Sequence, residues 1–165
     1  MTLTVDRLRE VLAYDAESGV FRWKITLSNR AVAGSIAGVI ERYVRIQIDG
    51  RPYYAQRLAW LWTHGEWPPK GIDHRNRKRT NNAIGNLREA DKQQNAANAK
   101  TPTHNTSGRV GVYWYKSRAK WRAGITIEGR QKSLGYFDRF EDAVKTRSIA
   151  ERRYFGEFVP HDNQA

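Results

Sequence analysis

The sequence predicts an α+β fold: an N-terminal helix with short strands, a polar central section, and a three-stranded antiparallel sheet packed on one helix. Two observations predict this fold class. Apolar and polar residues alternate in several short stretches, as in β-strands, and apolar residues recur every three or four positions in others, as in helices. A length of 165 residues allows one ordinary domain or two to three small ones. No apolar run approaches the roughly 20 residues that a membrane span requires.

Helical and strand patterns alternate in the first half of the chain. Thr4 can cap the first helix, and Leu8 and Val11 lie on its apolar side. The pair Asp49-Gly50 is a hairpin turn signal, and Gly65 ends the next helix. The expected elements are a helix at 2–13, a strand at 20–24, a loop at 26–36, hairpin strands at 43–48 and 51–54, and a helix at 56–64.

The second half begins with a polar segment and ends with a sheet pattern. Between residues 70 and 100 we expect an extended segment, a long polar loop and a helix from about Leu87 to Asn98. Asp138 and Glu141 form a capping-box pattern at the start of the last helix. That helix is expected to bury Phe140, Ala143, Val144 and Ile149. The expected strands are residues 109–115, 120–128 and 130–137.

These elements divide the chain into four predicted regions. The linker is the best marked of them, because threonine, serine, proline and glycine dominate it. The regions are an N-terminal part with a helix and a hairpin at 1–53, a core that contains the candidate site at 54–100, the linker at 101–108, and a sheet-and-helix domain at 109–160.

Composition indicates a polyanionic partner and a reducing compartment. The formal net charge is +12 and the isoelectric point is near 10.2. Basic and aromatic residues are interleaved at 113–122, which is typical of nucleic-acid binding. We expect no membrane partner, because the chain has no apolar run of spanning length. The absence of cysteine excludes disulfides, thiolate zinc sites and a cysteine nucleophile. The N-terminus lacks the apolar core of a signal peptide, so we expect a cytoplasmic protein.

One polar cluster stands out as a candidate site. His74 follows Asp73 directly, and Asn86 and Asn95 lie 13 and 22 positions after Asp73. Phosphodiester hydrolysis needs oxygen ligands for a hard cation, a base that activates water, and cations that hold the strand. The cations here are Arg75, Arg77, Lys78 and Arg79. The alternative interpretation is a solvated basic loop whose asparagines cap turns and helix ends.

The segment 54–98 resembles HNH endonucleases of the phage and intron-homing type. The motifs that carry the resemblance are a helix with Arg-Leu, a Trp/Pro loop, the Asp-His pair, an Asn-Asn pair, Asn-Leu-Arg and a closing Gln-Asn-x-x-Asn. The resemblance implies a ββα-metal core, in which a two-stranded ribbon and a helix hold one divalent metal, Mg²⁺ or Mn²⁺. It implies Asp73 and Asn95 as metal ligands and His74 as the general base. It also implies that Asn86 holds the loop and orients His74.

Gln56 occupies a position where such endonucleases typically have a histidine. This difference supports an alternative function, a catalytically impaired DNA-binding protein or regulator built on the same frame. Residues 1–50 resemble the region that precedes HNH cores, so the likeness is not confined to the motifs.

Residues 105–157 resemble the Apetala-type DNA-binding domain of ethylene-response factors. The residues that carry this resemblance are Gly111-Val112, Lys120–Ala123, Leu134–Phe137, Ala143 and Ala150. The resemblance implies a three-stranded sheet that enters the major groove with the helix packed behind it. The predicted DNA contacts in this region are Arg109, Tyr113, Tyr115, Lys116, Arg118, Lys120, Arg122, Thr126, Arg130, Gln131 and Lys132.

The combined prediction is a metal-dependent HNH endonuclease that hydrolyses phosphodiester bonds in duplex DNA. The resemblance implies a homing-type enzyme, associated with a phage or a mobile element and acting in a bacterial host cell. Double-stranded DNA is the expected partner, and RNA is a weaker alternative. A homodimer is left open, because one cleft in a monomer would nick DNA whereas a dimer could cut both strands.

Overall fold

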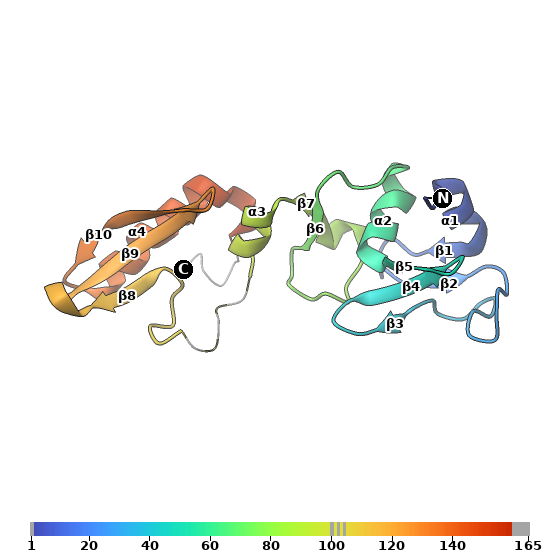
Figure 1. Ribbon diagram of the computed structural model, residues 1–165, viewed down its shortest axis with the longest axis horizontal. Coiled ribbons are helices and arrows are strands. Elements are labelled where there is room, and N and C mark those ends of the chain that lie inside the picture. The colour runs from blue at the N-terminus through green and yellow to red at the C-terminus, as the bar shows by residue number, and fades with distance from the viewer. Residues whose placement is uncertain (1, 100, 102, 104, 160–165) are drawn as a thin grey trace. The chain divides into compact units, whose positions relative to one another are not determined.

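The chain folds into two compact units, one of residues 1–91 and one of residues 92–165 (Figure 1). The computed structural model describes residues 2–99, 101, 103 and 105–159. Some positions of the predicted regions lie outside the described residues. They are residue 100 of the core, residues 102 and 104 of the linker, and residue 160 of the C-terminal domain. The fold contains both helices and strands in several small sheets, so the α+β prediction is confirmed. Within the described part of the chain, no helix is long and apolar enough to span a membrane.

The first unit begins with the predicted helix, although it is shorter than expected. Helix α1 spans Val5–Val11, and the Thr4 side chain accepts a hydrogen bond from the backbone N–H of Arg7 at 3.2 Å. The prediction that the helix continues to residue 13 is wrong. Strand β1 (Leu12–Tyr14) starts directly after the helix because it pairs antiparallel with β2 (Phe21–Trp23).

The predicted hairpin and second helix are both confirmed. Strands β4 (Val44–Ile48) and β5 (Arg51–Tyr54) form the hairpin, and the two-residue β3 (Val39–Ile40) pairs with β4. Asp49 and Gly50 both have positive φ, 49° and 75°, as a two-residue type I′ turn requires. Helix α2 (Ala55–His64) follows and ends at Gly65, whose φ is 79°.

The core of the first unit joins α1, the sheets and α2. Apolar residues from all of these elements are buried in a single cluster. Its fully buried large side chains are Leu8, Val11, Leu12, Ile46, Ile48 and Leu58. Because α1 and the first strands supply much of this core, the N-terminal region and the HNH-like segment fold as parts of one unit.

A two-stranded ribbon follows α2 and carries the candidate site. Strand β6 (Gly71–His74) pairs antiparallel with β7 (Leu87–Ala90), and the 3₁₀ turn η1 (Ile84–Asn86) precedes β7. The prediction of a helix from Leu87 is therefore wrong at its start. Residues 87–90 obtain their backbone hydrogen bonds from β6, and helix α3 begins only at Lys92 and ends at Ala97.

The turn between β1 and β2 holds the loop that precedes β7. The Tyr14 hydroxyl donates to the backbone carbonyl of Asn82 at 2.7 Å, and the N–H of Ile84 donates to the carbonyl of Ala16 at 3.1 Å. Gly19 lies directly against the same loop: a β-carbon at this position would approach the Ala83 nitrogen to 2.1 Å. Its φ of 74° also favours glycine.

Replacing Gly19 by alanine is expected to destabilise the first unit by at least about 2 kcal/mol, because left-handed strain and backbone overlap add. Urea denaturation measures this free energy. Gly50→Ala is the matched control: its φ is 75°, but nothing lies within 4 Å of the added carbon. Equal losses in the two variants would show that the contact with the loop contributes nothing.

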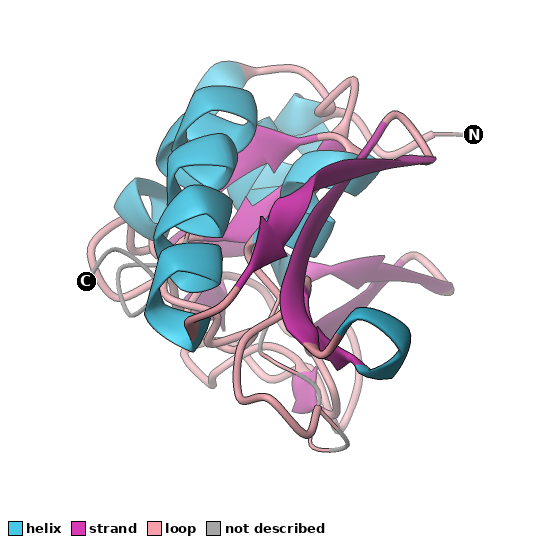
Figure 2. Ribbon diagram, turned by 90° about the vertical axis from the view of Figure 1, so that its left-hand side faces the viewer, coloured by secondary structure: helices cyan, strands magenta, loops and turns pink. Residues whose placement is uncertain are grey.

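The second unit is a three-stranded antiparallel sheet with one long helix on its face (Figure 2). The strands are β8 (Val112–Tyr115), β9 (Lys120–Ile127) and β10 (Arg130–Phe137), in the order β10-β9-β8. A 3₁₀ turn, η2 (Lys116–Arg118), joins β8 to β9. Helix α4 (Phe140–Phe155) and the turn η3 (Gly156–Phe158) follow. Leu134 and Phe137 both pack on the core because the register of β10 shifts between Ser133 and Gly135.

Two predictions about α4 are wrong. The helix cap is Arg139, without a side-chain hydrogen bond, because Asp138 instead forms an ion pair with Lys120 at 3.0 Å. Ile149 is 55% exposed rather than buried. The helix buries Ala143 and Arg147, four positions apart, and Ile149 lies on the opposite side.

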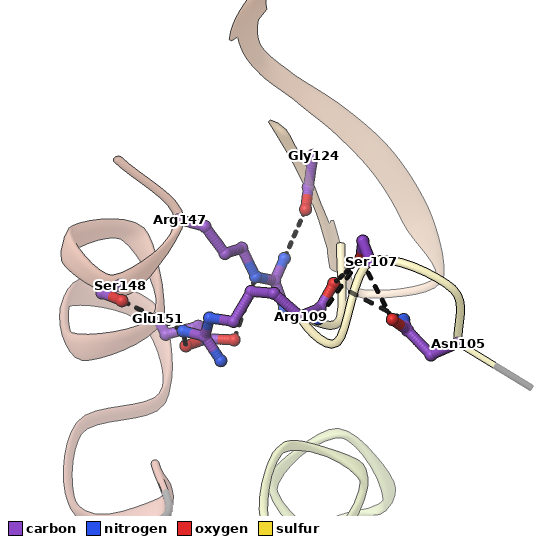
Figure 3. Close-up of polar contacts among 7 residues, drawn as sticks. All are labelled: Asn105, Ser107, Arg109, Gly124, Arg147, Ser148 and Glu151. Carbon is purple, nitrogen blue, oxygen red and sulfur yellow. Dashed lines mark hydrogen bonds and ion pairs between the residues drawn. The ribbon is translucent and has the colours of Figure 1, made fainter. Parts of the chain in front are cut away.

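A buried cluster of charged groups fastens α4 to the sheet (Figure 3). Glu151 accepts hydrogen bonds from both Arg109 and Arg147. Arg109 also donates to the Ser148 hydroxyl at 3.0 Å, and Arg147 donates to the carbonyl oxygen of Gly124. All three charged side chains are less than 10% exposed. One carboxylate therefore serves two guanidinium groups in the interior.

Candidate active site

The candidate site lies at the end of β6, where Asp73 and His74 are both buried. Asp73 faces Arg88 across the ribbon, and its Oδ2 accepts from Nε of Arg88 at 2.9 Å and from Nη2 at 2.8 Å. Both side chains of this ion pair are less than 10% exposed. Arg88 thus fixes the orientation of the carboxylate. This role of Arg88 was not predicted, because the sequence pattern favoured a helix at residue 88.

Asn82 holds the imidazole of His74. The Oδ1 atom of Asn82 lies 3.2 Å from Nε2 of His74, and its Nδ2 donates to the carbonyl of Thr80 at 3.3 Å. Because the amide group donates to Thr80 through its nitrogen, its oxygen faces the histidine and accepts from Nε2–H. The lone pair of the neutral ring is then on Nδ1. Burial lowers the pKa of His74, which favours this neutral form at neutral pH.

Asn86 holds the loop between the two ribbon strands. Its Oδ1 accepts from the backbone N–H of Asn76 at 3.0 Å, and its Nδ2 donates to the carbonyl of Asn81 at 2.8 Å. The N–H of Arg75 also donates to the carbonyl of Asn86 at 2.9 Å. Asn86 therefore braces the loop that presents Asn82 to His74. No role was predicted for Asn82, although it belongs to the Asn-Asn pair of the motif.

The basic run after His74 lies on this braced loop. Arg75, Lys78 and Arg79 are exposed, and Arg77 is half-buried in a turn with a φ of 59°. The Arg79 guanidinium lies over the Tyr43 ring at 5.3 Å from its centroid, and this ring is 6.1 Å from that of His74. The loop thus places cationic groups beside the buried histidine.

Two further predicted positions have different surroundings. Asn95 is half-buried on α3, which belongs to the second unit. Gln56 is buried in the first turn of α2, and among the described residues its Oε1 has no hydrogen-bond partner. A buried amide oxygen without a partner costs free energy, so Gln56 is an imperfect fit to its surroundings.

Comparison with known proteins identifies the family. The family model of the HNH endonucleases matches residues 53–97. Protein 3.8 of Escherichia phage T7 is 42% identical over 89 residues, which cover 52% of this chain and 74% of that protein. The chain belongs to the family of phage T7 Protein 3.8. No solved structure matches it significantly.

The HNH domain runs from the end of the β4–β5 hairpin to α3 and includes every predicted residue of the candidate site from Asp73 to Asn95. An HNH nuclease domain implies a DNA substrate. The Apetala-type resemblance concerns the second unit, which lies outside the matched segment apart from α3.

HNH nucleases generally use a divalent metal, and the donor set of this HNH domain fits a hard cation. Among the described residues, no three His, Asp or Glu side chains gather as ligands. Mg²⁺ keeps several waters and takes one or two carboxylates with other oxygen donors. The carboxylate of Asp73 and the amide oxygen of Asn95, the two predicted ligands, are donors of that chemical type.

The second unit presents most of its predicted DNA contacts at the surface. The exposed side chains are those of Tyr113, Lys116, Arg118, Thr126, Arg130, Gln131 and Lys132. The half-buried ones are those of Tyr115, Lys120 and Arg122. Arg109 differs from all of these, because its side chain is buried against Glu151 and Ser148. Its contacts are those of a structural residue, and we do not retain it among the proposed DNA contacts.

Proposed function

We propose that this HNH protein is a metal-dependent endonuclease of the homing type that hydrolyses phosphodiester bonds in duplex DNA. The observation that carries the proposal is the buried His74, whose Nε2–H is held by Asn82 and which follows Asp73 at the end of β6. A neutral imidazole whose Nδ1 carries a lone pair is suited to general-base catalysis.

In the proposed mechanism, Nδ1 of His74 removes a proton from the attacking water while Nε2–H remains bonded to Asn82. The water oxygen bonds to phosphorus in line with the leaving 3′ oxygen, and the P–O3′ bond breaks. The products carry a 5′ phosphate and a 3′ hydroxyl. Arg75 and Lys78, exposed on the loop, contact the flanking phosphates.

Asp73 and Asn95 would hold one Mg²⁺ or Mn²⁺ ion. When bound, this ion supplies Lewis-acid stabilisation of the negative charge that develops on the phosphate. Arg88 holds the Asp73 carboxylate in one orientation through its two contacts with Oδ2. The protein thus provides a ligand whose geometry is set before the metal arrives.

The part of the second unit that follows the predicted linker at 101–108 is proposed as the DNA-binding module, an Apetala-type domain. The support for this role is the exposed basic and aromatic surface of its sheet, together with the net charge of +12. In this proposal the nuclease core extends over residues 54–100 and the DNA-binding domain over residues 109–160.

Supercoiled plasmid tests the proposed reaction. With Mg²⁺ or Mn²⁺ we expect conversion to relaxed or linear DNA, and with excess EDTA the plasmid stays supercoiled, because Asp73 and Asn95 alone do not supply the Lewis acid. The ratio of relaxed to linear product reports nicking against double-strand cleavage. Conversion that continues at the same rate in EDTA would contradict the assigned roles of Asp73 and Asn95.

The buried and unpartnered oxygen of Gln56 favours a second candidate, a DNA-binding protein with impaired catalysis. This candidate predicts that plasmid is shifted on a gel but remains supercoiled, with or without metal. Gln56→His is then the informative variant. Cleavage gained by this substitution would identify the residue at position 56 as the cause of the impairment.

A further inference from the structure

A row of three side chains crosses the middle of the sheet in the second unit. In the strand register, Tyr113 of β8 pairs with Arg122 of β9, and Arg122 pairs with Tyr136 of β10. Strand β9 is the central strand. Paired residues project from the same face of a sheet, so the row places one arginine between two tyrosines at the centre of that face.

Aromatic rings surround the Arg122 guanidinium. Its central carbon lies 5.8 Å from the ring centroids of Tyr113 and Tyr136 and 5.9 Å from that of Tyr115. Its Nη1 donates to the Tyr113 hydroxyl at 2.8 Å. Contacts of this kind restrict a side chain that otherwise has many rotamers, so Arg122 is held in position before any ligand binds.

These contacts also decide which part of Arg122 can meet a ligand. The Nε atom is buried and has no hydrogen-bond partner among the described residues, so it faces away from solvent. An incoming ligand therefore meets the Nη1 and Nη2 end of the guanidinium. This end presents two parallel N–H donors, a pattern that matches the O6 and N7 acceptors of guanine in the major groove.

The tyrosines are not available as a stacking platform for unpaired bases. The Arg118 guanidinium lies over the Tyr136 ring, 4.4 Å from its centroid. The Arg122 guanidinium lies near three rings, those of Tyr113, Tyr115 and Tyr136. Proteins that bind single strands stack bases on open aromatic faces. Because guanidinium groups occupy these rings, the surface favours a paired duplex over a single strand.

We propose that Arg122 reads a guanine base of duplex DNA and that Tyr113 is a positioning residue that orients it. The inference rests on the proposed DNA-binding function of the second unit. A base contact fits Arg122 better than a phosphate contact, because Arg122 is half-buried on the central strand, whereas Lys116 is exposed in the turn that joins β8 to β9. Phosphate contacts come from such peripheral cations.

Selection from a random duplex library in EDTA tests the proposal on the full chain. We expect the wild type to enrich a site with guanine at one position. Arg122→Lys is expected to reduce that preference about tenfold or more, because lysine lacks the paired donors. Tyr113→Phe is expected to reduce it several-fold, because Nη1 of Arg122 loses the hydroxyl to which it donates. Lys116→Ala, the control, is expected to lower affinity for all sequences and to reduce the salt dependence of binding.

Each other result counts against the proposal. If Arg122→Lys or Tyr113→Phe changes affinity equally for every sequence, Arg122 contacts phosphate and not a base. Tighter binding of single-stranded DNA than of duplex would also overturn the assignment. Wild-type binding to duplex without any preference refutes the guanine contact but leaves the DNA-binding function intact. Absence of duplex binding refutes both. Thermal melting of each variant identifies any loss of DNA binding that is due to unfolding. Tyr113→Phe removes only one hydroxyl group, so it tests the proposal even if Arg122→Lys does not fold.

Discussion

Replacing His74 by alanine is expected to lower the rate of metal-dependent DNA cleavage by about two to four orders of magnitude, the range that a general base contributes. Alanine removes the Nδ1 lone pair that accepts the proton of the attacking water. Single-turnover cleavage of plasmid in Mg²⁺, with enzyme in excess, measures the step directly. The affinity of the second unit for DNA should remain unchanged.

Asn82→Ala separates the chemical role of His74 from its orientation. This variant keeps the imidazole but removes the acceptor that holds Nε2–H. We therefore expect a rate between those of the wild type and His74→Ala. Both positions are buried, so melting curves must accompany the rates. A His74→Ala protein that remains folded and cleaves within about threefold of the wild-type rate would eliminate the histidine as the base.

Replacing Glu151 by glutamine is expected to destabilise the second unit by about 3–5 kcal/mol, because a buried ion pair that loses one partner leaves an uncompensated charge. In this unit the penalty applies to two guanidinium groups, since Glu151 bonds to both Arg109 and Arg147 (Figure 3). Chemical denaturation followed by tryptophan fluorescence measures the effect.

Two substitutions on the same helix calibrate this result. Glu141 is exposed and pairs only loosely with Arg139, at 3.4 Å, so Glu141→Gln is expected to change stability by less than about 1 kcal/mol. Ser148→Ala removes one hydrogen bond from Arg109 and is expected to cost about 1–3 kcal/mol. If Glu151→Gln were as harmless as Glu141→Gln, the buried cluster would not be what holds α4 on the sheet.

The parts of the fold that could be predicted are those with local signals. Asp49-Gly50 specifies its own turn through positive φ at both residues, and Gly65 ends α2 for the same reason. The ribbon strand β7 could not be recognised locally, because its four residues become a strand only by pairing with β6. The capping pattern at Asp138 failed because a lysine distant in sequence competes for the carboxylate.

The candidate site likewise contains residues that the sequence indicates and residues that only the folded structure brings to it. Asp73 and His74 are adjacent and belong to a motif, so the sequence indicated them directly. Arg88 and Asn82 act on them through contacts that depend on the ribbon register and on the loop conformation. Arg109 was misassigned because a basic residue in a basic segment carries no sign of the glutamate that lies 42 positions later and buries it.

The contacts between the β1–β2 turn and the loop at Asn82 limit where the chain can be cut when this nuclease is fused to another protein. A segment cut at the boundaries of the family match, residues 53–97, loses Tyr14, Ala16 and Gly19 and with them the support of the loop that orients His74. Chimaeras with other DNA-binding modules should instead be joined after α3, which ends at Ala97, so that the N-terminal support and Asn95 are both kept. Recombination between related genes is expected to be tolerated at that junction and to be damaging within the first ninety residues.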